Sequence, residues 1–326
     1  MRAAWYERNG PARQVLEVGE MPDPQPGPGE VRVRIHASGV NPSDWKTRLG
    51  TSRPMAFPRV IPHSDGAGVI DRVGAGVPTR RVGERVWIWN GQWKRPFGTV
   101  AELVSLPSPQ AVRLPASVGF EEGACLGIPA LTAHRAVTAD GSIAGRSVLV
   151  SGGAGAVGRY AIQIAKLLGA RQVIATVSSA AKAMVARSAG ADLTIDYNSE
   201  SVADKVMQAT ADRGVDRVIE VDLAGNAELL PKIVTQDGLC VAYGSNAREV
   251  SFGFGPMILR GVAVRFFIVY ELSEADRNRG IADLTGWLEA GRLSHAIAAR
   301  YPLAEIAAAH EAVENGRMPG KVLVLP

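Results

Sequence analysis

Three glycines near the middle of the chain have the spacing of a loop that binds phosphate groups. Residues 148–158 read VLVSGGAGAVG, so an apolar strand pattern leads directly into Gly-x-Gly-x-x-Gly, and a helical pattern follows. In such a loop the first glycine makes the turn, the second lets the backbone approach a pyrophosphate, and the third lets helix and strand pack closely. The helix then directs free N–H groups and its positive dipole end at the phosphates. We predict a dinucleotide site, with a structural glycine turn as the alternative; the expected contacts are Gly153, Ala154, Gly155, Ala156, Val157 and Gly158.

The residues that follow this loop favour NADP over NAD. NAD sites usually place a carboxylate about 20 residues after the loop, where it binds both ribose hydroxyls. That position holds Ser178, followed by Ser179 and Lys182, and residues 175–182 contain no carboxylate. Hydroxyl groups and an ammonium group suit the additional 2′-phosphate of NADP, which a carboxylate would repel. The segment therefore predicts NADPH as the cofactor; the alternative, that the serines cap the next helix, does not exclude phosphate binding.

The patterns around the loop predict two domains, as expected for a chain of 326 residues. Residues 31–35 alternate between apolar and polar, and the first 115 residues or so are rich in turn signals, which favours a largely antiparallel β domain. Farther along, strand and helix patterns alternate, which indicates right-handed βαβ units and a parallel sheet. The strands expected there are 147–150, 172–177, 193–196, 217–221, 239–243 and 262–270, and the helices are 120–137, 158–168, 180–188 and 303–314, before a last strand at 321–325.

Composition and charge narrow the classes of partner. The net charge is 36 − 32 = +4, and the longest basic runs are the pairs Arg80-Arg81 and Lys94-Arg95. A nucleic-acid surface would need clustered charges interleaved with aromatic residues, so nucleic acid is not an expected partner. Two cysteines give neither a disulfide framework nor a zinc pattern. The N-terminus lacks the apolar core of a signal peptide, and no apolar stretch approaches the ~18 residues of a membrane span, so we expect a cytoplasmic protein without a membrane partner.

Further motifs, in their order and spacing, resemble those of one enzyme superfamily. They are GVNPSDW at 39–45, DGAGVIDRVG at 65–74, VGERV at 82–86, LGIPALTAH at 126–134 and GKVL at 320–323. With the glycine loop, they make the chain resemble the medium-chain dehydrogenases/reductases, and specifically their zinc-independent branch, the quinone oxidoreductases related to zeta-crystallin. The resemblance implies an α/β protein with a GroES-like β-barrel catalytic domain at 1–119 and 292–326. It also implies a Rossmann domain at 120–291, a doubly wound parallel sheet that binds NADP.

The resemblance also predicts that no metal takes part. Zinc alcohol dehydrogenases of the superfamily have a ligand cysteine where this chain has Asn41, and Gly-His-Glu where it has His63-Ser64-Asp65. Their structural zinc needs four cysteines, and this chain has 2. Without a Lewis acid that ionises an alcohol, hydride transfer favours electron-poor acceptors. The expected small-molecule substrates are therefore quinones or α,β-unsaturated carbonyls.

Three catalytic candidates lie in the segment that follows residue 40. The resemblance points to Asn41 as the donor of a hydrogen bond to a substrate oxygen or to the nicotinamide; an Asx turn before Pro42 is the alternative. Asp44 and Lys46 are candidates for the wall of the pocket. Related enoyl reductases often use a tyrosine acid shortly after this stretch, and residues 48–57 contain none. This favours a proton from solvent and speaks against an enoyl-thioester substrate.

Four further cofactor contacts are implied by the resemblance alone. They are Thr132 near the nicotinamide, Tyr197 near the adenosine phosphate, Ser245 after the strand at 239–243, and Lys321 near the C-terminus. A structural role is the alternative for each of them.

The apolar strand pattern at 262–270 bears on assembly. At a sheet edge such a strand must be covered, and pairing with a twofold copy covers it; relatives of this kind are often homodimers. Burial under helices on both faces is the alternative. The leading interpretation is a homodimeric NADPH-dependent oxidoreductase. The alternatives are an NADPH-binding protein of this fold with little catalysis, crystallin-like or RNA-binding, and an enoyl or alkenal reductase.

Overall fold

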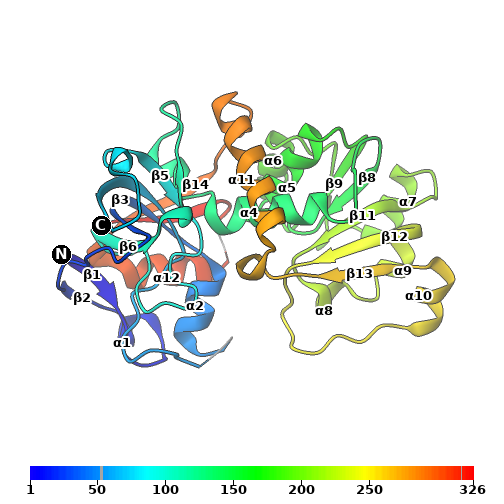
Figure 1. Ribbon diagram of the computed structural model, residues 1–326. Helices are drawn as coiled ribbons and strands as arrows, with labels where there is room; N and C mark the ends of the chain where they lie inside the picture. The colour runs from blue at the N-terminus through cyan, green and yellow to red at the C-terminus, as the bar shows by residue number, and fades with distance from the viewer. Residues whose placement is uncertain (52–53, 317) are drawn as a thin grey trace. The chain divides into compact units, whose positions relative to one another are not determined.

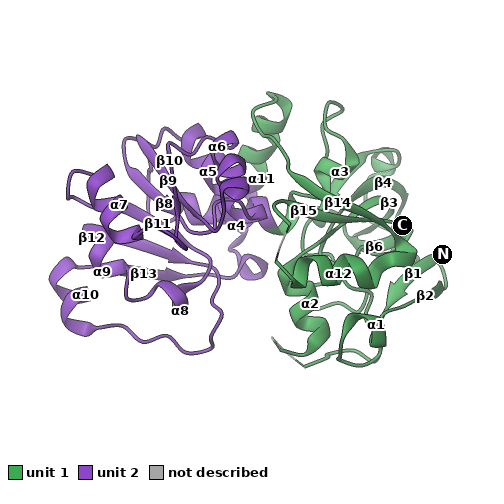
Figure 2. Cartoon of the chain, turned by 180° about the vertical axis from the view of Figure 1, so that it is seen from behind, with its two compact units in different colours: residues 1–128, 281–326 green, residues 129–280 purple. Residues whose placement is uncertain are grey.

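The computed structural model describes residues 1–51, 54–316 and 318–326, which form two compact units (Figure 2). Unit 1 comprises Met1–Ile128 and Ile281–Pro326, and unit 2 comprises Pro129–Gly280. The divisions fall inside two helices, α4 (Gly127–Thr138) and α11 (Glu274–Glu289), whereas the sequence places them after residues 119 and 291. The sequence pattern marks the residues at which strand patterns end and helical patterns begin. The two compact units, by contrast, are separated at residues inside the helices.

Unit 1 is built on a seven-stranded sheet with the order β14-β15-β3-β4-β5-β7, and β6 pairs with β3. Every pairing is antiparallel except that of β14 with β15, which confirms the largely antiparallel β domain. β1 (Arg2–Trp5) and β2 (Glu17–Glu20) form a separate antiparallel pair. The strands of the large sheet are β3 (Glu30–Val40), β4 (Asp65–Val73), β5 (Arg85–Ile88), β6 (Leu103–Pro107), β7 (Ala111–Arg113), β14 (Ile297–Pro302) and β15 (Lys321–Leu325).

Alternation along β3 explains how unit 1 buries its core. Val31, Val33 and Ile35 belong to a cluster of buried aliphatic side chains, whereas Arg34 and His36 are exposed. Each buried aliphatic side chain contributes ~1.5–3 kcal/mol relative to exposure. The register of β3 is therefore well specified, because a slip of one residue would carry the apolar side chains to the solvent face.

Two short helices of unit 1, α1 (Ala12–Val15) and α2 (Pro42–Leu49), are absent from the predicted elements, although the end signals of α2 are present. Pro42 opens α2 at a position where the missing N–H costs nothing, and Gly50 adopts φ 79 directly after it. Dense turn signals in this part of the chain conceal such a short helix. The helices that belong wholly to unit 1 are α1 (Ala12–Val15), α2 (Pro42–Leu49), α3 (Phe120–Gly123) and α12 (Ile306–Glu314).

Unit 2 is a six-stranded sheet with the order β10-β9-β8-β11-β12-β13. Figure 1 labels β9, β8, β11, β12 and β13 of this sheet. All of its pairings are parallel, which confirms the predicted parallel sheet. Counted along the chain, the order is 3-2-1-4-5-6, the doubly wound order of dinucleotide-binding sheets, with its topological switch point between β8 and β11. The strands are β8 (Ser147–Val150), β9 (Gln172–Val177), β10 (Leu193–Asp196), β11 (Val215–Glu220), β12 (Val234–Ala242) and β13 (Ala263–Phe266).

Two predicted elements need correction. The helix expected at 120–137 is interrupted between α3 and α4, because Pro129 lacks the N–H that would bond to the carbonyl of Cys125. The strand expected at 262–270 is confined to β13, and a short 3-10 helix at Val269–Glu271 follows it. The apolar pattern continues beyond the residues that pair with β12, so the pattern alone overestimates the strand.

The helices of unit 2 differ in burial; α5, for example, buries Ala161, Ile162 and Ile164, whereas α10 buries none of its residues. Besides α4 and α11 they are α5 (Ala156–Leu167), α6 (Ala180–Ser188), α7 (Val202–Ala209), α8 (Leu223–Asn226), α9 (Leu230–Ile233) and α10 (Phe254–Arg260). Within the described residues, no helix is both long enough and apolar enough to cross a membrane.

Candidate functional site

The glycine-rich loop connects β8 to α5 and is tied to the neighbouring strand β9. Gly152 has φ 67, a backbone conformation that favours glycine. Its N–H donates to Oγ1 of Thr176 at 3.1 Å, and the N–H of Gly153 donates to the carbonyl oxygen of Thr176 at 3.0 Å. Hydrogen bonds within the protein therefore fix the loop at the carboxyl end of the sheet.

Each glycine of the motif has a distinct structural task. A Cβ on Gly153 would lie 2.6 Å from the Cβ of Ala175, and a Cβ on Gly158 would collide with the carbonyl oxygen of Gly152. These two glycines allow strand, loop and helix to pack closely. Gly155 is exposed, and a Cβ there would meet only the Gly152 oxygen, at 3.3 Å. This part of the backbone is open to a ligand.

The first turn of α5 supplies hydrogen-bond donors beside Gly155. The N–H groups of Ala156, Val157 and Gly158 have no acceptor within the helix, because a helical N–H bonds to the carbonyl four residues earlier. Together with the helix dipole they form an anion site. The loop therefore fits the pyrophosphate of a dinucleotide.

Polar side chains gather where β9 and β10 end, at the same edge of the sheet as the loop. Lys182 Nζ donates to Ser178 Oγ at 3.0 Å, and Ser179 Oγ accepts the backbone N–H of Lys182 at 3.3 Å as the cap of α6. Asn198 Nδ2 donates to the carbonyl oxygen of Ser178 at 3.0 Å, and Tyr197 is 53% exposed. Ser179 thus takes the capping role, and the ammonium group of Lys182 beside the Ser178 hydroxyl suits a phosphate.

A buried carboxylate that sequence reasoning missed lies at the switch point. Glu220 ends β11, and its Oε1 accepts the backbone N–H of Asp222 at 2.6 Å and Nδ2–H of Asn226 at 3.0 Å. Asn226 Nδ2 also donates to Ser151 Oγ at 3.3 Å, so the cluster joins the ends of β8 and β11. Burial raises the pKa of the Glu220 carboxyl. An acidic residue at the end of an apolar strand is a pattern that could have pointed to Glu220. Only the strand order of the sheet, however, shows that β8 and β11 are neighbours.

A cavity of about 530 Å³ opens at the carboxyl ends of β12 and β13. Ligands of doubly wound sheets bind beyond this edge. Ser245, a predicted cofactor contact, lines the cavity, and its Oγ accepts the N–H of Ala247 at 3.2 Å. Phe266 and Phe267 line it as well, so the cavity offers both a polar group and aromatic surface to a ligand.

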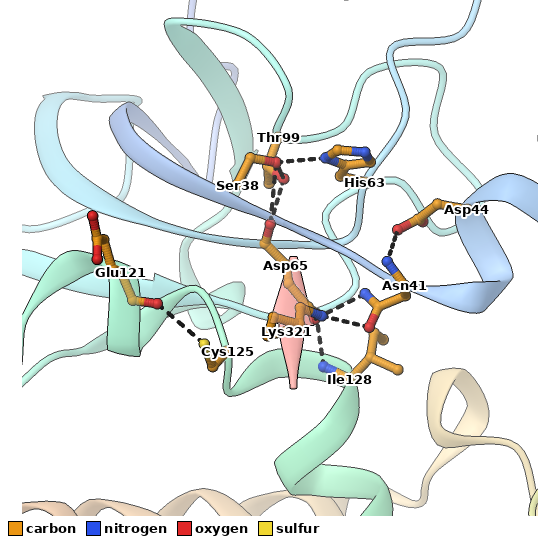
Figure 3. A network of polar contacts seen from close by, with 10 residues as sticks. All are labelled: Ser38, Asn41, Asp44, His63, Asp65, Thr99, Glu121, Cys125, Ile128 and Lys321. Atoms are coloured by element: carbon orange, nitrogen blue, oxygen red, sulfur yellow. Dashed lines mark hydrogen bonds and ion pairs between the residues drawn. The ribbon is translucent and has the colours of Figure 1, made fainter. Parts of the chain in front are cut away.

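Unit 1 contains a second polar cluster, formed by Asn41, Asp65 and Lys321 (Figure 3). Lys321 Nζ donates to Asp65 Oδ2 at 2.6 Å and to Asn41 Oδ1 at 2.5 Å, and Asn41 Nδ2 donates to Asp65 Oδ2 at 2.8 Å. The three residues are buried, with exposures of 2%, 0% and 3% in the order named. The structure thus joins two predicted residues, Asn41 and Lys321, to each other and to a third residue, Asp65, to which the sequence assigned no role.

Backbone and hydroxyl groups hold Asp65 from its other side. Its Oδ1 accepts the backbone N–H of Ile128, in the first turn of α4, at 2.7 Å, and its carbonyl oxygen accepts a hydrogen bond from Thr99 Oγ1 at 2.5 Å (Figure 3). Both carboxylate oxygens have partners, which is the condition for a buried charge. An acidic residue at the start of a strand of small residues was the signal that could have identified it.

The histidine near this cluster packs in the interior. His63 Nδ1 lies 2.8 Å from Ser38 Oγ, and its Nε2 lies 2.9 Å from Nε2 of His310. Burial holds the pKa of His63 well below its ordinary value and lowers that of His310 to about 3, so both rings are neutral. Among residues 1–51, 54–316 and 318–326, no group of three or more His, Cys, Asp or Glu residues could hold a metal ion.

Two of the remaining predicted residues, Asp44 and Lys46, make contacts with residues close to them in the sequence. Asp44 accepts the backbone N–H of Asn41 at 2.7 Å and so caps α2. Lys46 Nζ lies 5.7 Å from the ring centroid of Trp45, a cation–π distance. Both of these contacts lie within residues 41–46 and involve neither Asp65 nor Lys321. Thr132 is buried within α4 and belongs to unit 2.

Comparison with known proteins identifies relatives over the whole chain. Residues 27–116 match a family described as alcohol dehydrogenase GroES-like domain, and residues 156–284 match one described as zinc-binding dehydrogenase. The quinone oxidoreductase of Pseudomonas aeruginosa is 33% identical over 96% of each chain. A 2-haloacrylate reductase of Burkholderia sp is 30% identical over 100% of this chain and 99% of that one. The crystal structure of Escherichia coli quinone oxidoreductase complexed with NADPH covers 100% of both chains, with a TM-score of 0.88 and 25% identity.

These similarities confirm the predicted fold class. The GroES-like family match lies within unit 1, and the parallel sheet of unit 2 is of the Rossmann type. The sequence identity extends through both units rather than through the glycine loop alone. The chain belongs to the quinone oxidoreductase family, the zinc-independent branch of the medium-chain dehydrogenases/reductases.

Proposed function

We propose that this protein is an NADPH-dependent reductase that transfers a hydride to quinones or other α,β-unsaturated carbonyl compounds without a metal. The observation that carries the proposal is the buried cluster that holds the Asn41 amide as a donor, at a position where zinc-dependent relatives have a metal ligand. The names of the relatives support the acceptor class and the cofactor. The predicted cytoplasmic location belongs to the same proposal.

Residues of unit 2 would hold the cofactor. The N–H groups of Ala156, Val157 and Gly158 would bind the pyrophosphate, and Ser178 and Lys182 would bind the 2′-phosphate. When bound, NADPH supplies the hydride. Selection of NADPH over NADH then depends on one hydroxyl and one ammonium group at the place where NAD sites have a carboxylate.

Asn41 of unit 1 would bind the carbonyl oxygen of the acceptor. One Nδ2–H is bonded to Asp65, and we assign the second to the oxygen on which negative charge develops as the hydride arrives. A neutral amide stabilises this charge less than a metal ion does, which restricts the reaction to acceptors that are already electron-poor. The acceptor takes up one hydride and one proton, and the proton is assigned to solvent because residues 48–57 contain no tyrosine.

We also propose that two copies of the chain pair through β13. This strand is the edge of its sheet, and Phe266 is 65% exposed. On α10, Phe254 and Leu259 are 77% and 78% exposed. An exposed apolar edge is an aggregation hazard that twofold pairing removes. Sedimentation should show a dimer for the wild type and a monomer for Phe266→Glu, and a monomeric wild type would refute the pairing.

Thermal unfolding in NADPH and, separately, in NADH tests the proposed function first. A ligand that binds only the native state raises the free energy of unfolding by ~2.7 kcal/mol at a hundredfold excess over its dissociation constant. We expect a clear shift with NADPH, a small one with NADH, and then oxidation of NADPH by a quinone or an enone that persists in the presence of a chelator. A larger shift with NADH would overturn the cofactor assignment. A shift without turnover of any acceptor would favour the NADPH-binding protein.

A further inference from the structure

Asn41 can donate to a substrate oxygen only if its amide faces the right way. The oxygen and nitrogen of an asparagine side chain exchange places on a half-turn, and their partners decide which orientation is present. In one orientation the amide offers N–H to the developing oxyanion. In the other it offers a carbonyl oxygen, which repels that charge. The group that fixes this orientation therefore controls whether Asn41 can act.

Two buried charges fix the orientation together. The ammonium of Lys321, which can only donate, lies 2.5 Å from Asn41 Oδ1. The carboxylate of Asp65, which can only accept, lies 2.8 Å from Asn41 Nδ2. A reversed amide would place N–H against the ammonium and oxygen against the carboxylate, so both contacts would become repulsive at once.

The ion pair is itself anchored by the fold. A Cβ on Gly39 of β3 would lie 2.5 Å from Cε of Lys321, so the absence of a side chain there makes room for the lysine. β15, which carries Lys321, and β4, which begins at Asp65, both pair with β3. The N–H of Ile128 holds the second carboxylate oxygen. The charges are thus held in place by three strands and the start of α4.

We propose that Lys321 is a positioning residue: with Asp65 it fixes the Asn41 amide with Nδ2 as the donor to the substrate oxygen. Its positive charge at Oδ1 also polarises the amide, which strengthens the Nδ2–H donor. The inference rests on the proposed function and differs from the cofactor contact implied for Lys321 by the resemblance. Two of the three N–H donors of its buried ammonium are bonded to Asn41 and Asp65.

The informative variant removes both charges. Lys321→Met alone would leave the Asp65 carboxylate buried and unpaired, so the change is combined with Asp65→Asn. The oxygen of the new amide keeps the N–H of Ile128, and its nitrogen, which can only donate, then faces Asn41 and no longer holds Asn41 Nδ2 as the donor. We expect kcat with a quinone to fall by ~10- to 100-fold, while KM and the dissociation constant for NADPH change by less than about twofold. Lys166→Met, at an exposed ion pair with Asp192, is the matched control and should leave all three values unchanged.

Coupling to Asn41 distinguishes positioning from an independent role. In an Asn41→Ala background the double substitution should cause no further loss of kcat, because it acts through the amide that is already absent. A multiplicative loss would overturn the proposal. So would a rise in the dissociation constant for NADPH that matches the loss in kcat/KM, which would make Lys321 a cofactor contact.

A measurement on the protein without cofactor separates this inference from the proposed function. One Nδ2 proton of Asn41 should be protected from solvent exchange by its bond to Asp65, and the side-chain amide signal is assigned by its loss in Asn41→Ala. We expect this protection to fall by about tenfold or more in the double variant. Unchanged protection would overturn the inference. Absence of turnover in the wild type with every acceptor would refute the proposed function and leave the amide orientation to be decided by the exchange measurement.

Discussion

The loop of unit 2 and the cluster of unit 1 offer their ligands different kinds of group. The loop presents backbone N–H groups at residues 156–158, all from one continuous segment, and no charged side chain takes part in its turn. The cluster presents side chains from three distant segments and buries two full charges, Asp65 and Lys321. A site made of backbone tolerates many side chains as long as its glycines remain. A site made of buried charges depends on every partner.

The largest expected effect on stability comes from a substitution that breaks the buried cluster of unit 1. Asp65→Ala leaves the Lys321 ammonium buried without its counter-charge, so the free energy of unfolding should fall by ~3–5 kcal/mol. Chemical denaturation measures this. The matched control is Glu121→Ala, which removes a pair with Arg300 whose side chains are 36% and 50% exposed and should cost less than ~1 kcal/mol. Equal losses in the two variants would mean that the buried Asp65–Lys321 pair contributes no more to stability than the exposed Glu121–Arg300 pair.

The next effect concerns the charged side chain on which the unit 2 site depends. Lys182→Glu places a carboxylate beside Ser178, so the dissociation constant for NADPH should rise by ~10- to 100-fold and that for NADH far less. Titration with each nucleotide measures both constants. Lys232→Glu, on the exposed surface of α9, is the control. Equal changes for the two nucleotides would show that Lys182 is not a phosphate ligand.

A smaller effect tests the backbone of the loop. Gly158→Ala forces a Cβ against the carbonyl oxygen of Gly152, so it should destabilise the protein by ~1–3 kcal/mol and weaken the thermal shift with NADPH. Gly286→Ala on α11 introduces a Cβ with no atom within 4 Å and should be neutral or stabilise by up to ~1 kcal/mol. If Gly158→Ala and Gly286→Ala change the free energy of unfolding equally, the third glycine of the loop is not required for close packing.

The smallest effect, per pH unit, comes from the neutral histidines near the unit 1 cluster. Burial lowers the pKa of His310 to about 3 and that of His63 well below its ordinary value, so below about pH 6.5 the unfolded chain binds protons that the native state does not. Their contribution is full above about pH 6.5 and falls as the pH drops toward 3, by up to ~1.4 kcal/mol per pH unit for each ring. Denaturation at about pH 7 and about pH 5 should show a shallower fall for His310→Gln. An identical fall would contradict a neutral buried His310.

Local patterns were sufficient for most strands of unit 2 and for some of its helices. The strands at 147–150, 172–177 and 193–196 and the helix at 180–188 have the predicted bounds, because periodicity and turn glycines act within a few residues. The same reasoning missed α1 and α2, whose short lengths are concealed by neighbouring turn signals. In unit 2 it missed the helices from α7 to α11. It also overestimated β13, since apolar character persists after strand pairing has ended.

The sequence by itself determined the family, the alternation of strands and helices in unit 2, and the glycine loop, whose donors lie in one continuous segment. The tertiary structure alone decided which side chains meet in unit 1. Asn41 and Lys321 stand 24 and 256 positions from Asp65, and no local pattern links them. The pairing of β15 and β4 with β3 brings them together. A buried charge is stable only where its partners are already in place, and strand pairing across the whole unit, rather than any local preference, puts them there.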